Sequence, residues 1–475
     1  MPQGRLGRSL PLVSLTLRSA GAAALRRGHR GAQIAQAAER YAELLGRSRG
    51  ALMKAGQLMS FVAVGPAVPE DHRAVYQAVL SRLQDGAPPM PGQEAVAVAE
   101  AELGRPLDAV FAEFGQRPIA AASIGQVHAA RLPGGRQVAV KIQYPGVAEA
   151  IRDDLRNGEL LATFLQLGRG LTCVRADVTA LAAEISERIA QELDYRAEAA
   201  HHAEFAAAYR GHPSIRIPAI VPELCTSRLL TMDLADGRRW AQALMAPAAQ
   251  RDRWGEVIFR FAIGSLRRLG LVNADPHPGN YLFHDDGTVT FLDFGCVKRY
   301  TSEQVAALEA AVQAAVDSDA GQLSRVLVTA GFTDRAQPPE PGKLLCWLRE
   351  ALTPVTAPQP FTYTPEFAAA LARVDLSRSS PHADVIRRLT MPADFVSIAR
   401  VNLELTAVLG ALRATGRWEA IRCEHDFLRP ERPGPAATPL GRQDQAFWRE
   451  HPGRDTAGRA WPPEQRRRSA RGRPG

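Results

Sequence analysis

The chain has 475 residues, of which 46% are hydrophobic and 23% charged, a composition that excludes a wholly disordered chain, a coiled coil and a collagen-like fibre. Its formal net charge of +8 comes from its ends, since residues 1–31 carry six arginines and no acid, and residues 429–475 carry eleven arginines and five acids. The body between them is slightly acidic, so no nucleic-acid partner is expected, and five scattered cysteines without a CxxC pair exclude a disulfide framework and a zinc site.

The front of the chain is predicted to be helical. Residues 1–31 are expected to form a flexible basic segment, followed by a helical extension over 32–118. Apolar residues recur at helical spacing in 32–60, about 70–84 and about 93–103, with proline-containing loops between them.

A small β-rich lobe is predicted over residues 119–236. Ile119–Arg131 and Gln137–Gln143 have the pattern of two strands joined by a glycine-containing turn. Further elements are expected in this region. They are helices near 147–168 and 177–209 and short β segments near 219–224 and 228–233.

The following region, 237–428, is predicted to be a mainly helical lobe. A long helix over about 250–269 precedes a β-hairpin with an Asp286–Gly287 turn, and helices follow from 302. Residues 429–475 are expected to be a disordered basic tail, because they contain eight prolines and eleven arginines. The fold class that this order predicts is α+β, a two-lobed protein-kinase-like fold with a helical N-terminal extension.

Val138-Ala-Val-Lys141 ends the second predicted strand, as the V-A-I-K motif does in kinases, where the lysine contacts ATP phosphates. In most proteins, an isolated motif of this kind would hold a surface lysine that closes an amphipathic strand. Only four of the 58 basic residues are lysines, however, which makes an ammonium at this position informative. Such a lysine needs an acidic partner on a following helix, and the spacing leaves Glu192, Asp194 and Glu198 open.

Asp275 and Asn280 have the D-x4-N spacing of a kinase catalytic loop, in which the aspartate orients the nucleophile or accepts its proton and the asparagine binds a metal ion. Asp293 follows in an Asp-Phe-Gly motif and is expected to bind Mg²⁺. These side chains offer oxygen ligands, which suit Mg²⁺ and not zinc. His277, between two prolines, is predicted to hold the loop by a hydrogen bond.

Two features of ordinary protein kinases are missing. No G-x-G-x-x-G motif precedes Lys141, where Ile119–Gly125 stands instead, and no A-P-E motif follows Asp293 before the helix expected from Ser302. Without an activation segment there is little platform for a peptide substrate, which argues against an ordinary protein kinase.

These motifs together resemble the UbiB/AarF family of atypical, protein-kinase-like kinases, which includes mitochondrial coenzyme Q8-type homologues. The resemblance runs from about Glu39 to Phe427. Segments similar to the family's K-x-G-Q, L-Q-D-x-x-P-P, Ala-rich loop, E-x-D and hinge motifs occur in order. They are Lys54–Gln57, Leu83–Pro89, Ala120–His128, Glu192–Asp194 and Thr231–Asp233.

The resemblance implies binding of ATP or ADP with Mg²⁺, catalytic roles for Lys141 and Asp275, and metal binding by Asn280 and Asp293. It also implies a set of nucleotide contacts. These are Ala120, Ala121, Ala122, Ser123, Lys141, Glu198, Met232 and Leu234. Regulatory roles are implied for four further residues of the K-x-G-Q and E-x-D motifs. They are Lys54, Gln57, Glu192 and Asp194. In the family, the K-x-G-Q helix covers the active site and blocks peptide substrates.

In function, the resemblance implies ATPase activity in support of ubiquinone or other isoprenoid-lipid metabolism, with an unknown lipid or small-molecule substrate. No apolar run reaches the roughly 18 residues of a membrane span, so we expect a cytoplasmic protein without a transmembrane helix. Its basic ends are expected to be solvated tails, and the alternative is peripheral contact of these ends with the inner membrane face. Two alternatives are a nucleotide-sensing scaffold without required turnover and a small-molecule phosphotransferase of the aminoglycoside-kinase type. The K-x-G-Q and Ala-rich motifs argue against the small-molecule phosphotransferase.

Overall fold

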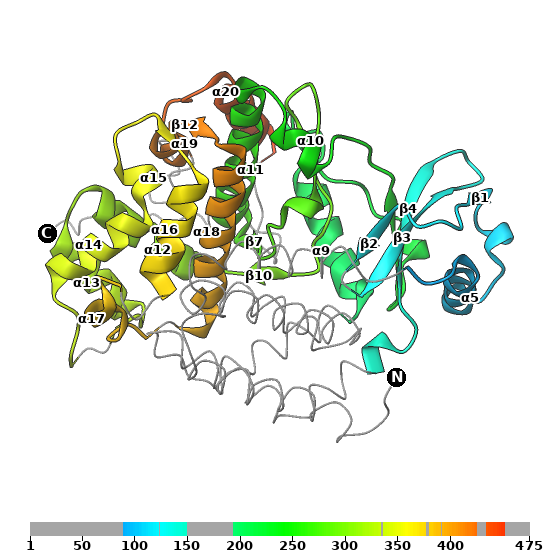
Figure 1. The fold of residues 1–475 in the computed structure, drawn as a ribbon, viewed down its shortest axis with the longest axis horizontal. Helices are drawn as coiled ribbons and strands as arrows, with labels where there is room; N and C mark the ends of the chain where they lie inside the picture. Colours follow the sequence, from blue (N-terminus) through cyan, green and yellow to red (C-terminus); the bar gives the residue numbers. More distant parts are fainter. Residues whose placement is uncertain are drawn as a thin grey trace, which may run out of the picture. The chain divides into compact units, whose positions relative to one another are not determined.

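The computed structural model describes seven stretches of the chain, drawn in colour in Figure 1. They are residues 89–122, 124–149, 193–333, 336–376, 380–390, 392–424 and 434–451. Four expected site residues lie outside these stretches, namely Lys54, Gln57, Ser123 and Glu192. Other predicted elements also lie outside them. These are the basic segment, the helices expected before residue 89, most of the helix expected near 147–168, the first half of the helix expected near 177–209 and the last 24 residues.

The chain divides into two compact units, and the boundary between them falls within helix α9 (Tyr195–Ala208). The first unit holds the described residues up to Ala200, Ala219–Ala235 and those within Ala372–Arg387. The second holds His201–Pro218, Asp236–Leu371 and the described residues from Arg388 onward. Both units combine helices with short, mostly antiparallel strands, which is an α+β architecture.

A five-stranded antiparallel sheet forms the centre of the first unit. Its strands are β1 (Glu113–Phe114), β2 (Ala120–Ala122), β3 (Gly125–Arg131), β4 (Gln137–Gln143) and β6 (Leu229–Asp233). Strand β4 lies between β3 and β6, and β1 and β2 share the other edge of β3. Helices α5 (Gly92–Leu103) and α17 (Ala383–Ile386) and the first turns of α9 belong to the same unit.

The predicted hairpin of β3 and β4 is present. Leu132 N donates to Arg136 O at 2.9 Å across its turn, and Gly135 has a φ of 84°, which glycine adopts without steric cost. The single strand predicted over Ile119–Arg131 is instead two strands, because β2 folds back to pair with the start of β3.

Strand β1 corrects the predicted helical extension over 32–118. Ala112 N donates to Arg131 O at 2.8 Å and Gly115 N donates to Ala129 O at 2.9 Å, so the end of this segment is part of the sheet. The helix expected near 93–103 is α5 (Gly92–Leu103), whereas the strand at 113–114 was not predicted, because two residues are too few to show a periodicity.

Helices dominate the second unit. They are α10 (Trp240–Leu244), α11 (Ala248–Leu269), α12 (Ser302–Val316), α13 (Ala320–Thr329), α14 (Pro341–Ala351), α15 (Thr353–Thr356), the part of α16 (Pro365–Leu376) up to Leu371, α18 (Ala393–Leu412), α19 (Trp418–Cys423) and α20 (Pro439–Glu450). Its strands are β5 (Ile215–Arg216), β7 (Leu271–Asn273), β8 (Tyr281–Phe283), β9 (Val289–Phe291), β10 (Val297–Arg299), β11 (Phe361–Thr362) and β12 (Thr415–Gly416). Strands β5, β9 and β8 form one sheet, while β7 pairs with β10 and β11 with β12.

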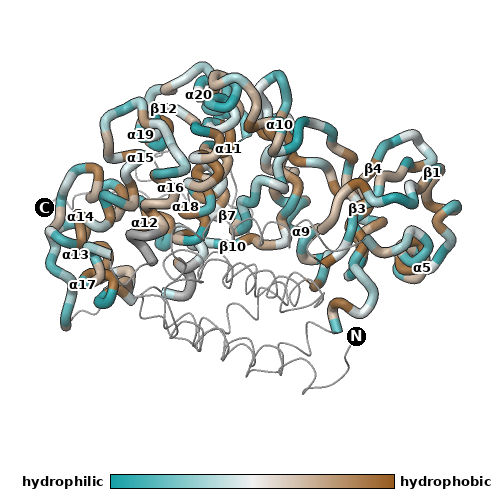
Figure 2. Tube along the Cα trace, viewed as in Figure 1, coloured by the Kyte–Doolittle hydropathy of each residue, from teal (hydrophilic) through white to brown (hydrophobic). Residues whose placement is uncertain are grey.

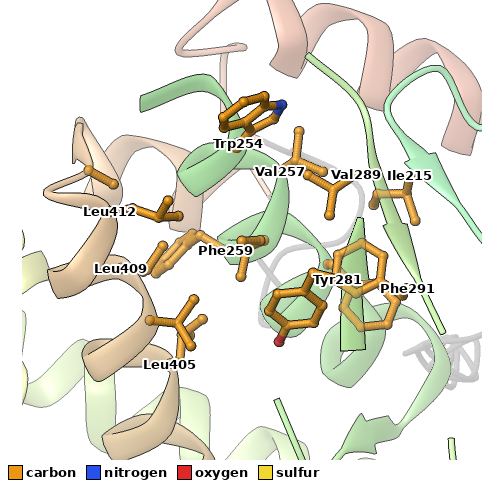
Figure 3. Packing of buried hydrophobic residues seen from close by; sticks show 14 of the residues in the cluster. Ile215, Trp254, Val257, Phe259, Tyr281, Val289, Phe291, Leu405, Leu409 and Leu412 are labelled. Atoms are coloured by element: carbon orange, nitrogen blue, oxygen red, sulfur yellow. The ribbon is translucent and has the colours of Figure 1, made fainter. Parts of the chain in front are cut away.

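The core of the second unit lies between helices α11 and α18 and the strands β8 and β9. Figure 3 shows Leu405, Leu409 and Leu412 of α18 on one side of this core and the rings of Tyr281 and Phe291 on the other. Most helices show both hydrophilic and hydrophobic residues in Figure 2, as expected where one face is buried and one meets solvent. None of the helices in the described segments is both long and apolar enough to cross a bilayer.

Helix α20 contradicts the prediction of disorder for the part of the tail that the structure describes, residues 434–451. Leu440, Phe447 and Trp448 are buried, and the Asp444 carboxylate accepts a hydrogen bond from His212 with an Nε2–Oδ1 distance of 3.0 Å. Proline and arginine counts over the whole tail mask this short amphipathic stretch, whose apolar residues recur at helical spacing.

Candidate nucleotide and metal site

Strand β4 carries Lys141 into the interior of the first unit, where it meets a carboxylate from α9. Its Nζ donates to both oxygens of Glu198, at 2.8 and 2.9 Å, and lies 4.9 Å from the centre of the Tyr195 ring. The side chains of Lys141 and Glu198 are only 8% and 4% exposed. Burial at this depth requires that both charges be compensated, and the two-oxygen contact does so.

The structure thereby distinguishes the acidic candidates that spacing left open. Glu198 pairs with Lys141, whereas Asp194 lies just before α9 and its Oδ1 accepts from Arg196 N at 3.0 Å. Glu192 lies outside the described residues. Asp194 thus contributes to the start of the helix that carries Glu198.

The Ala-rich segment forms a strand where ordinary kinases have a glycine-rich loop. Ala120, Ala121 and Ala122 pair with Val127, Gln126 and Gly125. A Cβ at Gly125 would lie 2.2 Å from the carbonyl oxygen of Ile142, so only glycine permits this approach of β3 to β4. Ser123 lies outside the described residues.

The hinge-like segment Thr231–Asp233 is the end of strand β6, which pairs with β4. Met232 is buried opposite Ala139, and Leu234 just beyond the strand is half-buried. Two main-chain N–H groups here already have protein acceptors, since Asp233 N donates to Ala219 O at 2.9 Å and Leu234 N donates to Gln137 O at 3.1 Å.

Buried polar side chains join the N-terminal end of the described chain to β3. The Gln126 side chain accepts from Met90 N at 2.9 Å and donates to Met90 O at 3.3 Å, and its Nε2 lies 2.8 Å from His128 Nε2. His128 Nδ1 lies 2.7 Å from Gly115 O, so Nδ1 is the donor and Nε2 the acceptor of a neutral imidazole. Burial lowers the pKa of His128 below its usual value of 6.5, although the hydrogen bond to Gly115 opposes this.

A neutral buried His128 predicts that the protein loses stability in mild acid. Since its pKa is lower in the folded than in the unfolded chain, the unfolded chain takes up the proton first as the pH falls below about 6.5. We expect His128→Gln to make the decline in unfolding free energy between about pH 7.5 and 5.5 shallower, by at most about 1.4 kcal/mol per pH unit. Urea unfolding at a series of pH values measures this slope.

The matched control is Phe114→Leu, because Phe114 stacks on His128 with ring centroids 5.1 Å apart. This variant removes the stacking but keeps the imidazole, so its pH slope should equal that of the wild type. Equal slopes for His128→Gln and the wild type would contradict the assignment.

In the second unit, Asn273 joins the start of the D-x4-N loop to the Asp-Phe-Gly motif. Its Nδ2 donates to Asp293 O at 2.8 Å, and its Oδ1 accepts from Asp275 N at 3.1 Å. Pairing of β7 with β10 reinforces this junction, since Ala274 N donates to Cys296 O at 2.8 Å. Sequence reasoning assigned Asn273 no role, although its place at the head of the motif is a usable signal.

Asn280 and Asp293 lie at the same end of the β8–β9 hairpin. Leu292 N donates to Asn280 O at 3.0 Å, which continues the register in which Tyr281 faces Phe291. Asp293 is the next residue, and its Oδ1 accepts from Gly295 N at 2.9 Å. A carboxylate and an amide oxygen here fit Mg²⁺, which takes one or two protein oxygens and shares the rest with phosphates and water.

Within the loop, His277 holds the backbone as predicted. Its Nδ1 accepts from Gly279 N at 3.1 Å. This bond shapes the short turn Pro278–Asn280 that leads into β8.

Asp275 is held by an arginine from a distant part of the sequence. Arg400 Nη2 on α18 donates to Asp275 Oδ1 at 3.2 Å, and Arg400 Nε donates to Glu404 Oε1 at 2.7 Å. Burial lowers the pKa of Arg400, but the charges of Glu404 and Asp275 outweigh it and raise that pKa above its usual value. Burial, together with the same two carboxylates, raises the pKa of Tyr281 well above 10.

Two rings of helix α9 pack against the phenylalanine of the Asp-Phe-Gly motif. Phe294 is fully buried, with the rings of His202 and Phe205 at 4.8 and 4.7 Å between centroids. Glu198, His202 and Phe205 follow one another at intervals of four and three residues, so they lie on one face of α9.

Comparison with known proteins links these features to one family. The sequence model of the ABC1 atypical kinase-like domain matches residues 82–327, just over half of the chain. The protein ACTIVITY OF BC1 COMPLEX KINASE 1, chloroplastic, of Arabidopsis thaliana is 34% identical over 279 residues, covering 58% of this chain and 41% of the relative. Atypical kinase COQ8B, mitochondrial, of Rattus norvegicus is 36% identical over 284 residues, covering 59% and 52%.

The match spans about half or less of the length of these curated relatives. A solved structure, the complex of Rv3197 with erythromycin from Mycobacterium tuberculosis, is similar over more of the chain. It has a TM-score of 0.58 and 30% sequence identity, and the match covers 77% of this chain and 89% of that chain.

Proposed function

Because the chain belongs to the ABC1 atypical kinase-like family, the UbiB/AarF family, we propose that it binds ATP or ADP with Mg²⁺ and turns over ATP. The buried pair of Lys141 and Glu198 carries this proposal. A nucleotide triphosphate is a strongly anionic ligand, and an ammonium held in place by a carboxylate on the next helix is the kinase device for its phosphates.

In this proposal the first unit supplies the nucleotide contacts. Lys141 contacts the phosphates and Glu198 positions it, while the Ala-rich segment, Met232 and Leu234 contact the rest of the nucleotide. Because the N–H groups of Asp233 and Leu234 already have acceptors, base recognition depends on other groups of this segment. Lys54, Gln57, Glu192 and Asp194 are proposed to regulate access.

The second unit supplies the groups of the reaction. Asp275 orients the attacking water or hydroxyl, and Asn280 and Asp293 hold Mg²⁺. When bound, Mg²⁺ neutralises phosphate charge and orients the terminal phosphoryl group. Asn273 keeps Asp275 and Asp293 in register through its two hydrogen bonds.

The short segment after Asp293 supports a substrate other than a protein. Only six residues separate Gly295 from Ser302, where α12 begins, and three of them form β10 in its pairing with β7. No length remains for the extended activation segment on which protein kinases bind peptides. We infer a lipid or other small-molecule substrate, in support of isoprenoid-quinone metabolism, with peripheral membrane contact through the basic ends.

A Mg²⁺-dependent ATPase assay of the full chain tests this proposal. We expect turnover by the wild type that EDTA abolishes, turnover reduced about 100-fold or more in Asp275→Asn, and nucleotide binding retained by that variant. Arg325→Gln is the control, since Arg325 is exposed and hydrogen-bonds to Gln322 on its own helix. If the wild type binds nucleotide but does not turn it over, the chain is a nucleotide-sensing scaffold.

The similarity to Rv3197 favours a second candidate, in which the chain binds a macrolide. Thermal unfolding with erythromycin, with Mg²⁺–ADP and with buffer alone compares the two. A rise in melting temperature with erythromycin only would replace the nucleotide proposal by this one.

A further inference from the structure

We infer that Arg400 is a positioning residue for Asp275, an inference that rests on the proposed phosphotransfer function. Arg400 lies on α18, 73 residues beyond the end of the family match at residue 327. Nothing in that match assigns it a role. Its contact with Asp275 exists only because α18 returns to the D-x4-N loop within the second unit.

The guanidinium group is itself held on both sides. Glu404, one helical turn further along α18, accepts from Nε at 2.7 Å, and this leaves Nη2 directed to Asp275 Oδ1 at 3.2 Å. The side chain of Glu404 is 7% exposed and that of Arg400 is 20% exposed. A planar guanidinium can bridge two carboxylates with fixed geometry, which a lysine ammonium does not reproduce.

The helix that presents Arg400 has little freedom to move. Leu405, Leu409 and Leu412 of α18 are nearly inaccessible to solvent in the core of the second unit (Figure 3). Side chains locked by packing hold functional groups more accurately than side chains on loops. The core therefore fixes Glu404, Glu404 fixes Arg400, and Arg400 fixes Asp275.

This contact engages one oxygen of Asp275 and leaves the other for the reaction. Among the described residues, no hydrogen-bond donor reaches Oδ2 of Asp275, whose side chain is 33% exposed. Oδ2 is thus available to accept from the attacking water or hydroxyl.

The test uses the full chain and the variants Arg400→Gln and Arg400→Lys. We expect Arg400→Gln to lower kcat about 10- to 100-fold, as misplacement of a catalytic group does, with KM for ATP and the Kd of Mg²⁺–ADP within about twofold of wild type. Arg400→Lys should recover part of kcat, because it keeps the charge but not the bridge. Arg325→Gln should resemble the wild type.

Loss of Arg400 also removes the ion pair between Arg400 and the buried Glu404, which could lower activity through folding alone. The double variant Arg400→Gln, Glu404→Gln removes both charges. We expect it to regain the melting temperature of the wild type and to keep the low kcat. Recovery of kcat in the double variant would overturn the inference, and so would weakened nucleotide binding with normal kcat in Arg400→Gln.

Hydrogen exchange separates this inference from the proposed function. In Arg400→Gln, the backbone amides of the Asp275–Asn280 loop should exchange faster than in the wild type and in Arg325→Gln. This holds whether or not the wild type hydrolyses ATP. A wild type without turnover removes the proposed function, whereas unchanged exchange of this loop in Arg400→Gln removes the positioning role.

Discussion

Replacement of Asp293 by asparagine is expected to lower ATP turnover about 100-fold or more and to raise the Mg²⁺ concentration needed for half-maximal rate. Loss of an outer partner of a metal ligand costs about 10- to 100-fold, and loss of a ligand's charge should cost at least as much. The amide oxygen of asparagine can still accept from Gly295 N, so the fold should persist. ATPase rates measured across a Mg²⁺ titration give both quantities.

Asp286→Asn is the matched control for this substitution. Asp286 lies in the turn of the same hairpin, is exposed and pairs with Arg216. Its rate and Mg²⁺ dependence should equal those of the wild type. Turnover by Asp293→Asn at the wild-type rate would show that Asp293 is not a metal ligand.

Glu198→Gln is expected to destabilise the first unit and to abolish most turnover. Removing one partner of a buried ion pair leaves the other charge uncompensated, which costs about 3–5 kcal/mol of unfolding free energy. Urea unfolding measures the stability, and the ATPase assay measures the turnover.

The double variant Lys141→Met, Glu198→Leu separates the structural from the functional part of this loss. Apolar replacement of a buried pair is often neutral or stabilising, so stability should return while turnover stays low. Glu113→Gln, which removes an exposed pair with Arg131, should leave both quantities close to wild type. A double variant with normal turnover would contradict the role of Lys141 in phosphate binding.

Short, local patterns predicted much of this fold. The kinase-like α+β class is confirmed, as are helix α11, the β3–β4 hairpin and the β8–β9 hairpin with glycine in its turn. The periodicity of a long helix and the turn chemistry of a hairpin depend on neighbouring residues, so a single sequence contains them.

Contacts between distant segments could not be predicted in this way. Spacing left three acids open for Lys141, because the choice of Glu198 depends on where α9 meets β4. The contact of Arg400 with Asp275 could not be predicted for the same reason. The two residues are 125 positions apart in the sequence, and nothing in the sequence distinguishes Arg400 from the other arginines among the 54. In the segment 219–224, Ile220 forms the expected β structure as a bridge to Met232, whereas Pro222 begins a 3₁₀ helix that was not predicted.

The shared face of α9 sets a constraint on how the length of this helix can change in evolution. Glu198 holds Lys141, while His202 and Phe205 hold Phe294. One residue inserted between His202 and Phe205 would turn Phe205 by about 100° relative to His202, so the two rings could not both remain on Phe294. Related chains should therefore tolerate substitutions in this interval far better than single-residue insertions or deletions.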